Sequence, residues 1–342
     1  MGRVLVDIGS ISKSIKTKFG VDIKPASEFS DAKRISTGLS SLDMAIGGGV
    51  PVGSATIIEG RYASTKSALC YKIAGEAYND LKLPVLLIHS ELSYEYSSDF
   101  AKACGLPVEN TLVIEEGGIE DALNTVFFAL KNEKLSCVII DSLAALKTKS
   151  SMDSVDSSKS FGAQAIIMNR FFNQLSANMP KENRPIVLCT QHLYLSPGPS
   201  GRTSYNRTGG QAQGYMAALI IRLSNAETQE VEIKGDAKGV ASEPVFSIIK
   251  WEVKKNKLGP ATKSGTYRLY MTDTDFPMGT ISDTPQALIY GVQCGLIQRA
   301  GGWYVYNGEK YHGESKLLKA LHGKEKEIFE HYDAFVKNAL KG

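Results

Sequence analysis

The residues with the clearest chemical potential lie in the stretch IIEGRYASTKSALC, residues 57–70. Gly60, Lys66 and Ser67 stand at the spacing of the phosphate-binding pattern G-x-x-x-x-G-K-[ST], but Thr65 occupies the position of the second glycine. In such a loop, backbone N–H groups at a helix N-terminus hold phosphate oxygens, the lysine reaches the β- and γ-phosphates, and the hydroxyl binds Mg²⁺. The second glycine is essential only where the backbone takes a positive φ or approaches the ligand closely. Either this loop still binds a nucleotide, or it is an ordinary turn between a strand and a helix.

Polar side chains at the ends of three further apolar stretches favour the nucleotide site. VLLIHSE ends at Glu91, which is placed to act as a general base toward an attacking water. CVIID ends at Asp141, a carboxylate that would hold the shell of a Mg²⁺ ion, and IVLCTQ ends at Gln191, which could sense the γ-phosphate. One aspartate at a strand end is common by chance. Four strand ends that each carry a nucleotide-handling residue indicate a site.

These side chains need a sheet whose strand ends meet at one edge. Short apolar runs alternate with helical patterns from Arg34 to about Met271, which predicts an α/β fold with a parallel sheet covered on both faces. Ligands bind such sheets at the carboxyl ends of the strands. We expect helices at 66–81 and 161–179, and strands at 55–60, 84–91, 111–116, 136–143, 184–191, 217–223 and 246–253.

Composition limits the partners and the compartment. The 342 residues carry a net charge of only +3, so a polyanion must be met by local basic patches. The five cysteines form no C-x-x-C pair, which argues against a zinc site and fits a reducing compartment. The sequence has no run of eighteen apolar residues and no signal-peptide core, so we expect a cytoplasmic protein that contacts no membrane.

With these motifs in place, the sequence resembles the RecA family of homologous recombinases, particularly the bacteriophage UvsX type, over nearly the whole chain. Members of that type also lack the second glycine and carry Ser-Glu where this chain has Ser90-Glu91, although His89 stands where bacterial members have an acidic residue. The resemblance rests on ISTGLSSLDMAIGGGVPVGSATIIEG, VIIDSLAAL, the strand that ends in Gln191, TGG at 208–210, VKKNK at 253–257 and GGWYVYNGEK at 301–310, in the family's order.

The resemblance implies three parts. These are an N-terminal polymerisation arm at 1–33, a RecA-like P-loop ATPase core with a mostly parallel central sheet at 34–271, and a small α/β C-terminal domain at 272–342. Two irregular segments that follow strand ends, 147–160 and 192–210, correspond to the family's DNA-binding loops. From the residues alone, the arm is either a docking piece for the next subunit or a solvated amphipathic helix.

The resemblance also implies a DNA-dependent ATPase that uses ATP and Mg²⁺. Glu91 would be the base, Gln191 would link the γ-phosphate to the DNA loop, and Lys255 and Lys257 would act in the neighbouring subunit's site like arginine fingers. Without the resemblance, these two lysines would read as a solvated charge run. The residues expected to hold the nucleotide are Gly60, Ala63, Ser64, Thr65, Lys66, Ser67, Ala68, Phe100 and Asp141, with Ser67 and Asp141 at the metal.

The second irregular segment has features that suit nucleic acid. Between Asn183 and Ala226 the sequence has no carboxylate, while basic and aromatic residues are interleaved, as expected for contact with phosphates and stacked bases. Phe161 either wedges between bases or packs in the core at a helix start. The expected DNA-binding residues are Lys159, Phe161, Arg202, Tyr205, Arg207, Gly209, Gly210 and Arg222.

These inferences predict a recombinase that forms a helical filament on single-stranded DNA, with ATP at the subunit interface, and pairs that strand with homologous double-stranded DNA. Two other classes remain open: a ring-forming RecA-fold helicase motor, and a weakly hydrolysing recombination mediator with a decayed phosphate loop. A viral member would act in the host cytoplasm. Basic residues of the C-terminal domain are candidates for recruiting the duplex, namely Arg299, Lys310, Lys316, Lys319 and Lys324.

Overall fold

The computed structural model describes residues 7–21, 23–28, 33–91, 94, 98–115, 117–148, 160–197, 203–207, 212–234, 240–260, 263–274 and 276–340. The chain divides into two compact units, Met1–Lys33 and Arg34–Gly342. A boundary within the second unit near residue 271 stays a prediction. In the part of the chain that is described, no helix combines the length and apolarity needed to cross a bilayer.

The first unit contains the helix α1 (Ile8–Phe19) and the short 3₁₀ helix η1 (Ala26–Glu28). The Asp7 side chain accepts a hydrogen bond from the Gly9 N–H and begins α1, and Gly20, in the left-handed conformation, ends it. Apolar side chains at helical spacing are exposed along α1, namely Ile8, Ile11, Ile15 and Phe19. Within this unit, the helix therefore presents an uncovered apolar stripe.

The second unit is built on one large sheet. Its described strands follow the order β12-β11-β10-β9-β3-β7-β6-β4-β5, and β8 pairs with β7 outside this path. The pairs from β9 through β3, β7, β6 and β4 to β5 are parallel, while β10, β11 and β12 extend one edge antiparallel. The bounds are β3 (Ala55–Gly60), β4 (Val85–His89), β5 (Thr111–Glu115), β6 (Cys137–Asp141), β7 (Ile186–Pro197), β8 (Thr203–Arg207), β9 (Leu219–Lys234), β10 (Val240–Asn256), β11 (Ser264–Tyr270) and β12 (Ile281–Ser282). This arrangement confirms the α/β class and the mostly parallel centre.

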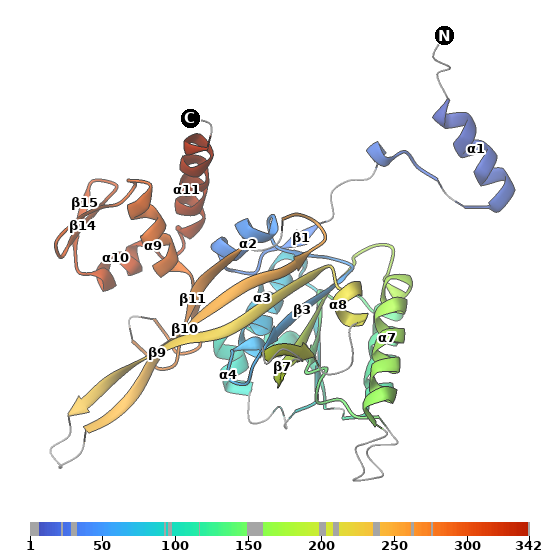
Figure 1. Ribbon diagram of the computed structural model, residues 1–342, viewed down its shortest axis with the longest axis horizontal. Helices are drawn as coiled ribbons and strands as arrows, with labels where there is room; N and C mark the ends of the chain where they lie inside the picture. Colours follow the sequence, from blue (N-terminus) through green and yellow to red (C-terminus); the bar gives the residue numbers. More distant parts are fainter. Residues whose placement is uncertain are drawn as a thin grey trace. The chain divides into compact units, whose positions relative to one another are not determined.

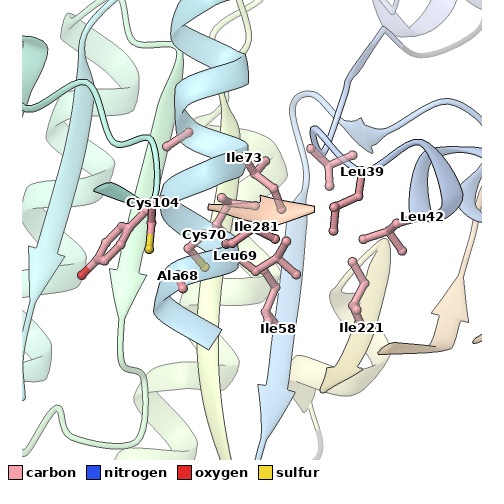
Figure 2. Packing of buried hydrophobic residues seen from close by; sticks show 14 of the residues in the cluster. Leu39, Leu42, Ile58, Ala68, Leu69, Cys70, Ile73, Cys104, Ile221 and Ile281 are labelled. Carbon is pink, nitrogen blue, oxygen red and sulfur yellow. The ribbon is translucent and has the colours of Figure 1, made fainter. Parts of the chain in front are cut away.

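Helices cover both faces of the sheet because the central strands are apolar on both sides (Figure 1). Alternate strand residues pack with α3 (Lys66–Leu81) on one face and with α5 (Ile119–Asn132) and α7 (Ser160–Asn178) on the other. Figure 2 shows Leu69 and Ile73 of α3 packed against Ile58 and Ile221 of the sheet. The remaining helices and short strands before residue 272 are α2 (Ser40–Ile46), α4 (Ser98–Ala103), η3 (Val108–Asn110), α8 (Ala212–Met216), β1 (Arg34–Ile35) and β2 (Val50–Pro51).

The C-terminal part has its own apolar cluster, which includes Tyr304, Leu317 and Phe329. The helices and strands of this C-terminal part are α9 (Thr284–Gln293), β13 (Gln298–Ala300), β14 (Trp303–Tyr306), β15 (Glu309–His312), α10 (Glu314–Leu321) and α11 (Glu325–Ala339). Two of the cations expected to recruit a duplex are engaged within this part. Arg299 lies over the Tyr304 ring and Lys324 over the Tyr306 ring.

The segment 192–210 departs from the expected irregular loop. β7 continues to Pro197 and pairs antiparallel with β8, with Leu193 opposite Arg207 and Leu195 opposite Tyr205. The Gly- and Pro-rich composition predicted a loop along the whole stretch, but the residues that flank 198–202 form paired strands. The hairpin therefore extends a core strand beyond the sheet edge.

Candidate nucleotide-binding site

The phosphate-loop sequence lies between the end of β3 at Gly60 and the start of α3 at Lys66. Two of its residues, Ala63 and Thr65, have φ of 58°, the left-handed conformation that glycine normally supplies. Left-handed residues alternating with others turn backbone N–H groups inward and form an anion-binding concavity. The position of the missing glycine thus does require a positive φ, and a threonine adopts it.

A distant hydroxyl holds Thr65 in this conformation. The Thr65 Oγ1 lies 2.8 Å from the hydroxyl of Tyr267, which is buried in β11. Burial raises the pKa of Tyr267, so this hydroxyl stays neutral and available for hydrogen bonding. A left-handed L-residue costs about 1–2 kcal/mol, and a hydrogen bond contributes about 1 kcal/mol. The Tyr267 contact therefore offsets much of the strain that threonine introduces.

Gly60 allows the backbone of the loop to lie close to strand β9 and to Ser64. A side chain there would place its first carbon 2.6 Å from the carbonyl oxygen of Leu223 on β9 and closer still to Ser64. The loop consequently packs against the neighbouring strand with no room for a methyl group. A residue with a side chain therefore does not fit at Gly60, whereas Thr65 does fit at the position of the second glycine.

Lys66 is buried and folds back over the loop. Its Nζ donates a hydrogen bond of 2.9 Å to the Arg61 carbonyl oxygen, which also accepts from Ser64 Oγ at 2.7 Å. Burial lowers the pKa of Lys66, and the charges of Asp141 and Glu91 oppose that shift. A phosphate oxygen would replace the carbonyl as the partner of this ammonium group.

The two carboxylates reach the site from adjacent strands. Asp141, the last residue of β6, is buried and accepts a hydrogen bond of 2.6 Å from Thr190 Oγ1. Ser90 ties the end of β4 to β6 because its N–H donates to the Asp141 carbonyl and its hydroxyl bonds to the Ser142 backbone, each at 2.9 Å. Glu91 follows directly and is thereby aimed at the loop.

Glu91 is paired with a residue that the sequence reasoning missed. His192 Nε2 lies 2.7 Å from Glu91 Oε1. This hydrogen bond is the main cause that lowers the pKa of Glu91 from 4.5 to about 2, against the opposing effect of burial. The alternation of side chains along the strand could have identified His192. Thr190 faces Asp141, so the residue two positions later, His192, faces the same way.

Gln191, the residue expected to sense the γ-phosphate, lies on the opposite face of the sheet from His192. His192 lies on the α3 face of the sheet, whereas Gln191 lies on the α5 and α7 face, in register with Glu59 of β3. Gln191 is fully buried and is not among the residues that line the nucleotide cavity. Its expected role as the link between the γ-phosphate and the DNA loop stays a prediction.

One cavity brings together the expected nucleotide-binding residues other than Gly60, which does not line it. It has a volume of about 440 Å³ and includes Lys66, Glu91 and Asp141 in its wall. The Ser67 hydroxyl and the Asp141 carboxylate both line it, and hard oxygen donors of this kind are the ligands that Mg²⁺ prefers. The wall also contains Tyr62, Ala63, Ser64, Thr65, Ser67, Ala68, Phe100, His192, Asn225, Thr228, Ser247, Leu269 and Met271.

Lys255 and Lys257 lie away from this cavity in their own subunit. Lys255 Nζ donates to the carbonyl oxygens of Gly214 and Tyr215 at 2.7 and 2.6 Å, and Lys257 Nζ donates to that of Met216 at 3.3 Å. Both ammonium groups thus cap the carboxyl end of α8. Their expected role in the neighbouring subunit's site stays a prediction.

The expected DNA-binding residues are only partly described. Lys159, Arg202, Gly209 and Gly210, as well as the side chain of Phe161, lie outside the described residues. Tyr205 is half exposed, and the Arg222 guanidinium lies 5.2 Å from its ring centroid. Both line a hollow of about 550 Å³ that also involves Arg61, Tyr62 and Asn225.

The absence of carboxylates between residues 183 and 226 does not leave all the basic residues unpaired. Arg207 Nε lies 2.5 Å from Glu59 Oε2, and Arg222 Nη2 lies 2.7 Å from Glu59 Oε1. Glu59 belongs to β3, more than a hundred residues earlier, and only the sheet brings it beside these arginines. A local count of charges therefore overstated the free positive charge of this segment.

A phosphate-type loop between a central parallel strand and a helix, with carboxylates at neighbouring strand ends, defines an α/β protein of the P-loop class. Within that class, the family described as "RecA N-terminal domain" matches residues 8–274, most of the chain. The chain therefore belongs to the RecA family.

Individual relatives agree with this assignment. The protein named "Protein RecA" of Thioalkalivibrio sulfidiphilus is 27% identical over 281 residues, which are 82% of this chain and 76% of that protein. "Protein RecA" of Sulfurimonas denitrificans is 27% identical over 315 residues, 92% of this chain and 86% of the relative. That of Desulforapulum autotrophicum is 27% identical over 307 residues, 90% and 83% of the two chains.

Proposed function

We propose that this protein is an ATP-dependent recombinase of the UvsX type, which forms a helical filament on single-stranded DNA and catalyses homologous pairing and strand exchange. The observation that carries the proposal is the single cavity in which Lys66, Ser67, Glu91 and Asp141 meet, in a chain of the RecA family. The Thr65 conformation supports it further, because the variant loop keeps the backbone shape that binds phosphate.

Each cavity residue has a role in ATP hydrolysis under this proposal. The loop N–H groups and Lys66 bind the phosphates and neutralise charge that develops on the γ-phosphoryl group. Ser67 and Asp141 hold Mg²⁺, which supplies electrostatic stabilisation to the phosphates when bound. Glu91 orients the attacking water. With a pKa of about 2, Glu91 is a weak proton acceptor, so the positioning of the water matters more than proton transfer.

In addition to Gln191, His192 is placed to respond to the γ-phosphate. It lines the cavity, contacts Glu91 and begins the extension of β7 into the β7–β8 hairpin. A γ-phosphate that attracts or repels the Glu91–His192 pair would shift the hairpin with it. Nucleotide binding and binding of single-stranded DNA are then reciprocally coupled.

The filament part of the proposal draws on two features of the chain. The apolar stripe of α1 is uncovered within its own unit and suits a docking site on the next subunit. Among the described residues, the hydrogen-bond partners of the Lys255 and Lys257 ammonium groups are carbonyl oxygens at the end of α8, so the phosphates of an adjacent subunit's ATP can compete for them. ATP would then sit at the interface between subunits, and double-stranded DNA would be the second partner. We place this activity in the cytoplasm.

Lys66→Ala tests the proposal. We expect loss of ATP hydrolysis and of ATP-stimulated binding to single-stranded DNA, because the phosphates lose their buried cation. Lys72→Ala, on the same helix but not in the cavity wall, is the matched control and should keep both activities. ATP-stimulated binding that survives Lys66→Ala would contradict the proposed coupling.

A joint-molecule assay separates the recombinase from its alternatives. A recombinase pairs a single strand with homologous duplex, a helicase motor unwinds a fork, and a mediator hydrolyses little ATP. Joint molecules that depend on ATP are the expected result. Fork unwinding without joint molecules would favour the helicase motor.

A further inference from the structure

Glu59 is a buried carboxylate next to the phosphate loop that the nucleotide chemistry does not use. It directly precedes Gly60, its side chain is completely buried, and it does not line the nucleotide cavity. It lies on the sheet face that α5 and α7 cover, opposite α3. A buried carboxylate is costly unless it is paired and hydrogen-bonded, so its partners define its role.

The two partners of Glu59 are held unequally. Arg222, on the neighbouring strand β9, donates to Oε1 from Nε at 2.8 Å and lies 2.7 Å from it through Nη2. Arg207, at the end of β8, donates to Oε2 from Nε alone, at 2.5 Å. Arg222 by itself therefore keeps the carboxylate paired, and Arg207 is the partner that can leave.

Even with Glu252, which lies opposite Arg222 on β10, the cations Arg207, Arg222 and Lys255 outnumber the carboxylates in this region. Two guanidinium groups face one carboxylate, and each arginine side chain keeps about a fifth of its surface exposed, 22% and 23%. Lys255 approaches the same place because it donates to the carbonyl of Gly214, and a methyl group on Gly214 would lie 2.8 Å from Arg207 Nη1. The chemistry that this surplus fits is an anion with several oxygens, such as a phosphodiester group.

The ion pair also joins two functional segments. Glu59 is adjacent in sequence to the phosphate loop, and Arg207 directly precedes the TGG of residues 208–210 in the proposed DNA-binding segment. The Glu59 side chain therefore connects Arg207 directly to the residue that precedes Gly60.

We propose that Glu59 is a coupling residue that holds Arg207 in the DNA-free protein and gives it up to a phosphodiester group of single-stranded DNA. Arg222 stays on the carboxylate and keeps it paired during the exchange. Glu59 thereby lowers the affinity for DNA until a phosphate takes its place, and it transmits the release of Arg207 to the phosphate loop. This inference rests on the proposed binding of single-stranded DNA.

Glu59→Gln tests the exchange in the full-length protein. Binding of a labelled oligonucleotide is measured by fluorescence anisotropy without nucleotide, over a series of salt concentrations. For single strands, the slope of log K against log salt steepens by about 0.7 for each phosphate neutralised. We expect Glu59→Gln to tighten binding roughly tenfold because no carboxylate competes for Arg207, and to leave the slope unchanged because Arg207 neutralises one phosphate in both complexes. Glu314→Gln, which removes the partner of Arg268 at 3.2 Å, is the matched control and should change neither value.

The double variant Glu59→Gln/Arg207→Gln assigns the gain. The gain in affinity should disappear and the slope should become shallower by about 0.7, because the cation that neutralises one phosphate is no longer present. Tighter binding that persists in the double variant would overturn the proposal, and so would a single variant that behaves like the wild type. Circular dichroism melting checks that each variant is folded.

Two further measurements keep the result decisive. If Glu59→Gln does not fold, Arg207→Gln alone should make the salt slope of ATP-stimulated binding shallower by about 0.7, and an unchanged slope would overturn the exchange. A wild-type protein without any ATP-stimulated binding would instead refute the proposed function. The two failures are therefore distinguishable.

Discussion

Replacing Tyr267 with phenylalanine tests whether a distant hydroxyl allows a threonine in the phosphate loop. The Thr65 and Tyr267 hydroxyls lie 2.8 Å apart, and Thr65 is half-buried, so water can hydrate its hydroxyl after the change. Losing such a hydrogen bond costs about 1 kcal/mol. We expect Tyr267→Phe to lower the free energy of unfolding by about 1 kcal/mol and to weaken ATP binding by up to about fivefold, because the binding-competent loop is less populated.

Thr65→Gly separates strain from hydrogen bonding. Glycine takes a φ of 58° without the roughly 1–2 kcal/mol that an L side chain costs there. In the wild type, however, the change also removes a partner from the buried Tyr267 hydroxyl, which costs about 1–3 kcal/mol. With phenylalanine at 267 no hydroxyl is left to satisfy, so the same glycine should stabilise the protein by about 1 kcal/mol. The effect of Thr65→Gly on the free energy of unfolding is therefore more favourable with phenylalanine at position 267 than with tyrosine. We expect it to change from destabilising to stabilising.

Urea unfolding and titration with a fluorescent ATP analogue, applied to the wild type, both single variants and the double variant, measure this coupling. Tyr304→Phe, a buried tyrosine of the C-terminal cluster, is the control and should leave the affinity for the analogue unchanged. Single-variant effects that add within about 0.5 kcal/mol would refute the reasoning, because Thr65 and Tyr267 would then act independently.

Three further predictions concern other groups. His192→Ala should raise the pKa of Glu91 from about 2 toward 4.5, which NMR of the carboxyl carbon measures, and an unchanged pKa would contradict this. In the wild type, the Glu91–His192 pair stabilises the fold above pH 4.5 and loses that effect as the pH falls toward 2. Burial raises the pKa of Asp283 from 3.8 to about 6, so the folded state binds the extra proton and the stability falls as the pH rises from about 4 to 6. Asp283→Asn should remove this loss, on the order of 2 kcal/mol, and urea midpoints at pH 4.5 and pH 7 that shift equally in both proteins would argue against it. Finally, Lys255→Ala and Glu91→Gln should each abolish ATP hydrolysis. A mixture of the two proteins should regain part of the activity, at interfaces that combine an intact Glu91 with an intact Lys255. A mixture as inactive as its components would exclude action between subunits.

The local parts of the site could be predicted from the order of the residues alone. The apolar run of β3, the loop after Gly60 and the helix from Lys66 follow from residues that are neighbours in the chain. The carboxylates at Glu91 and Asp141 follow from where apolar strands end. Local backbone preferences and burial of continuous apolar segments are sufficient to predict these features.

The tertiary structure alone decided how those parts are completed. Tyr267 is 202 residues from the Thr65 that it supports, and Arg207 is 148 residues from Glu59. The pleat of β7, set by its register with β3 and β6, placed His192 in the wall of the candidate nucleotide cavity and Gln191 on the other face of the sheet. Such contacts depend on which strands become neighbours and on which face each side chain points to. Strand order and register are settled by packing of the whole sheet, so no short stretch of sequence contains them.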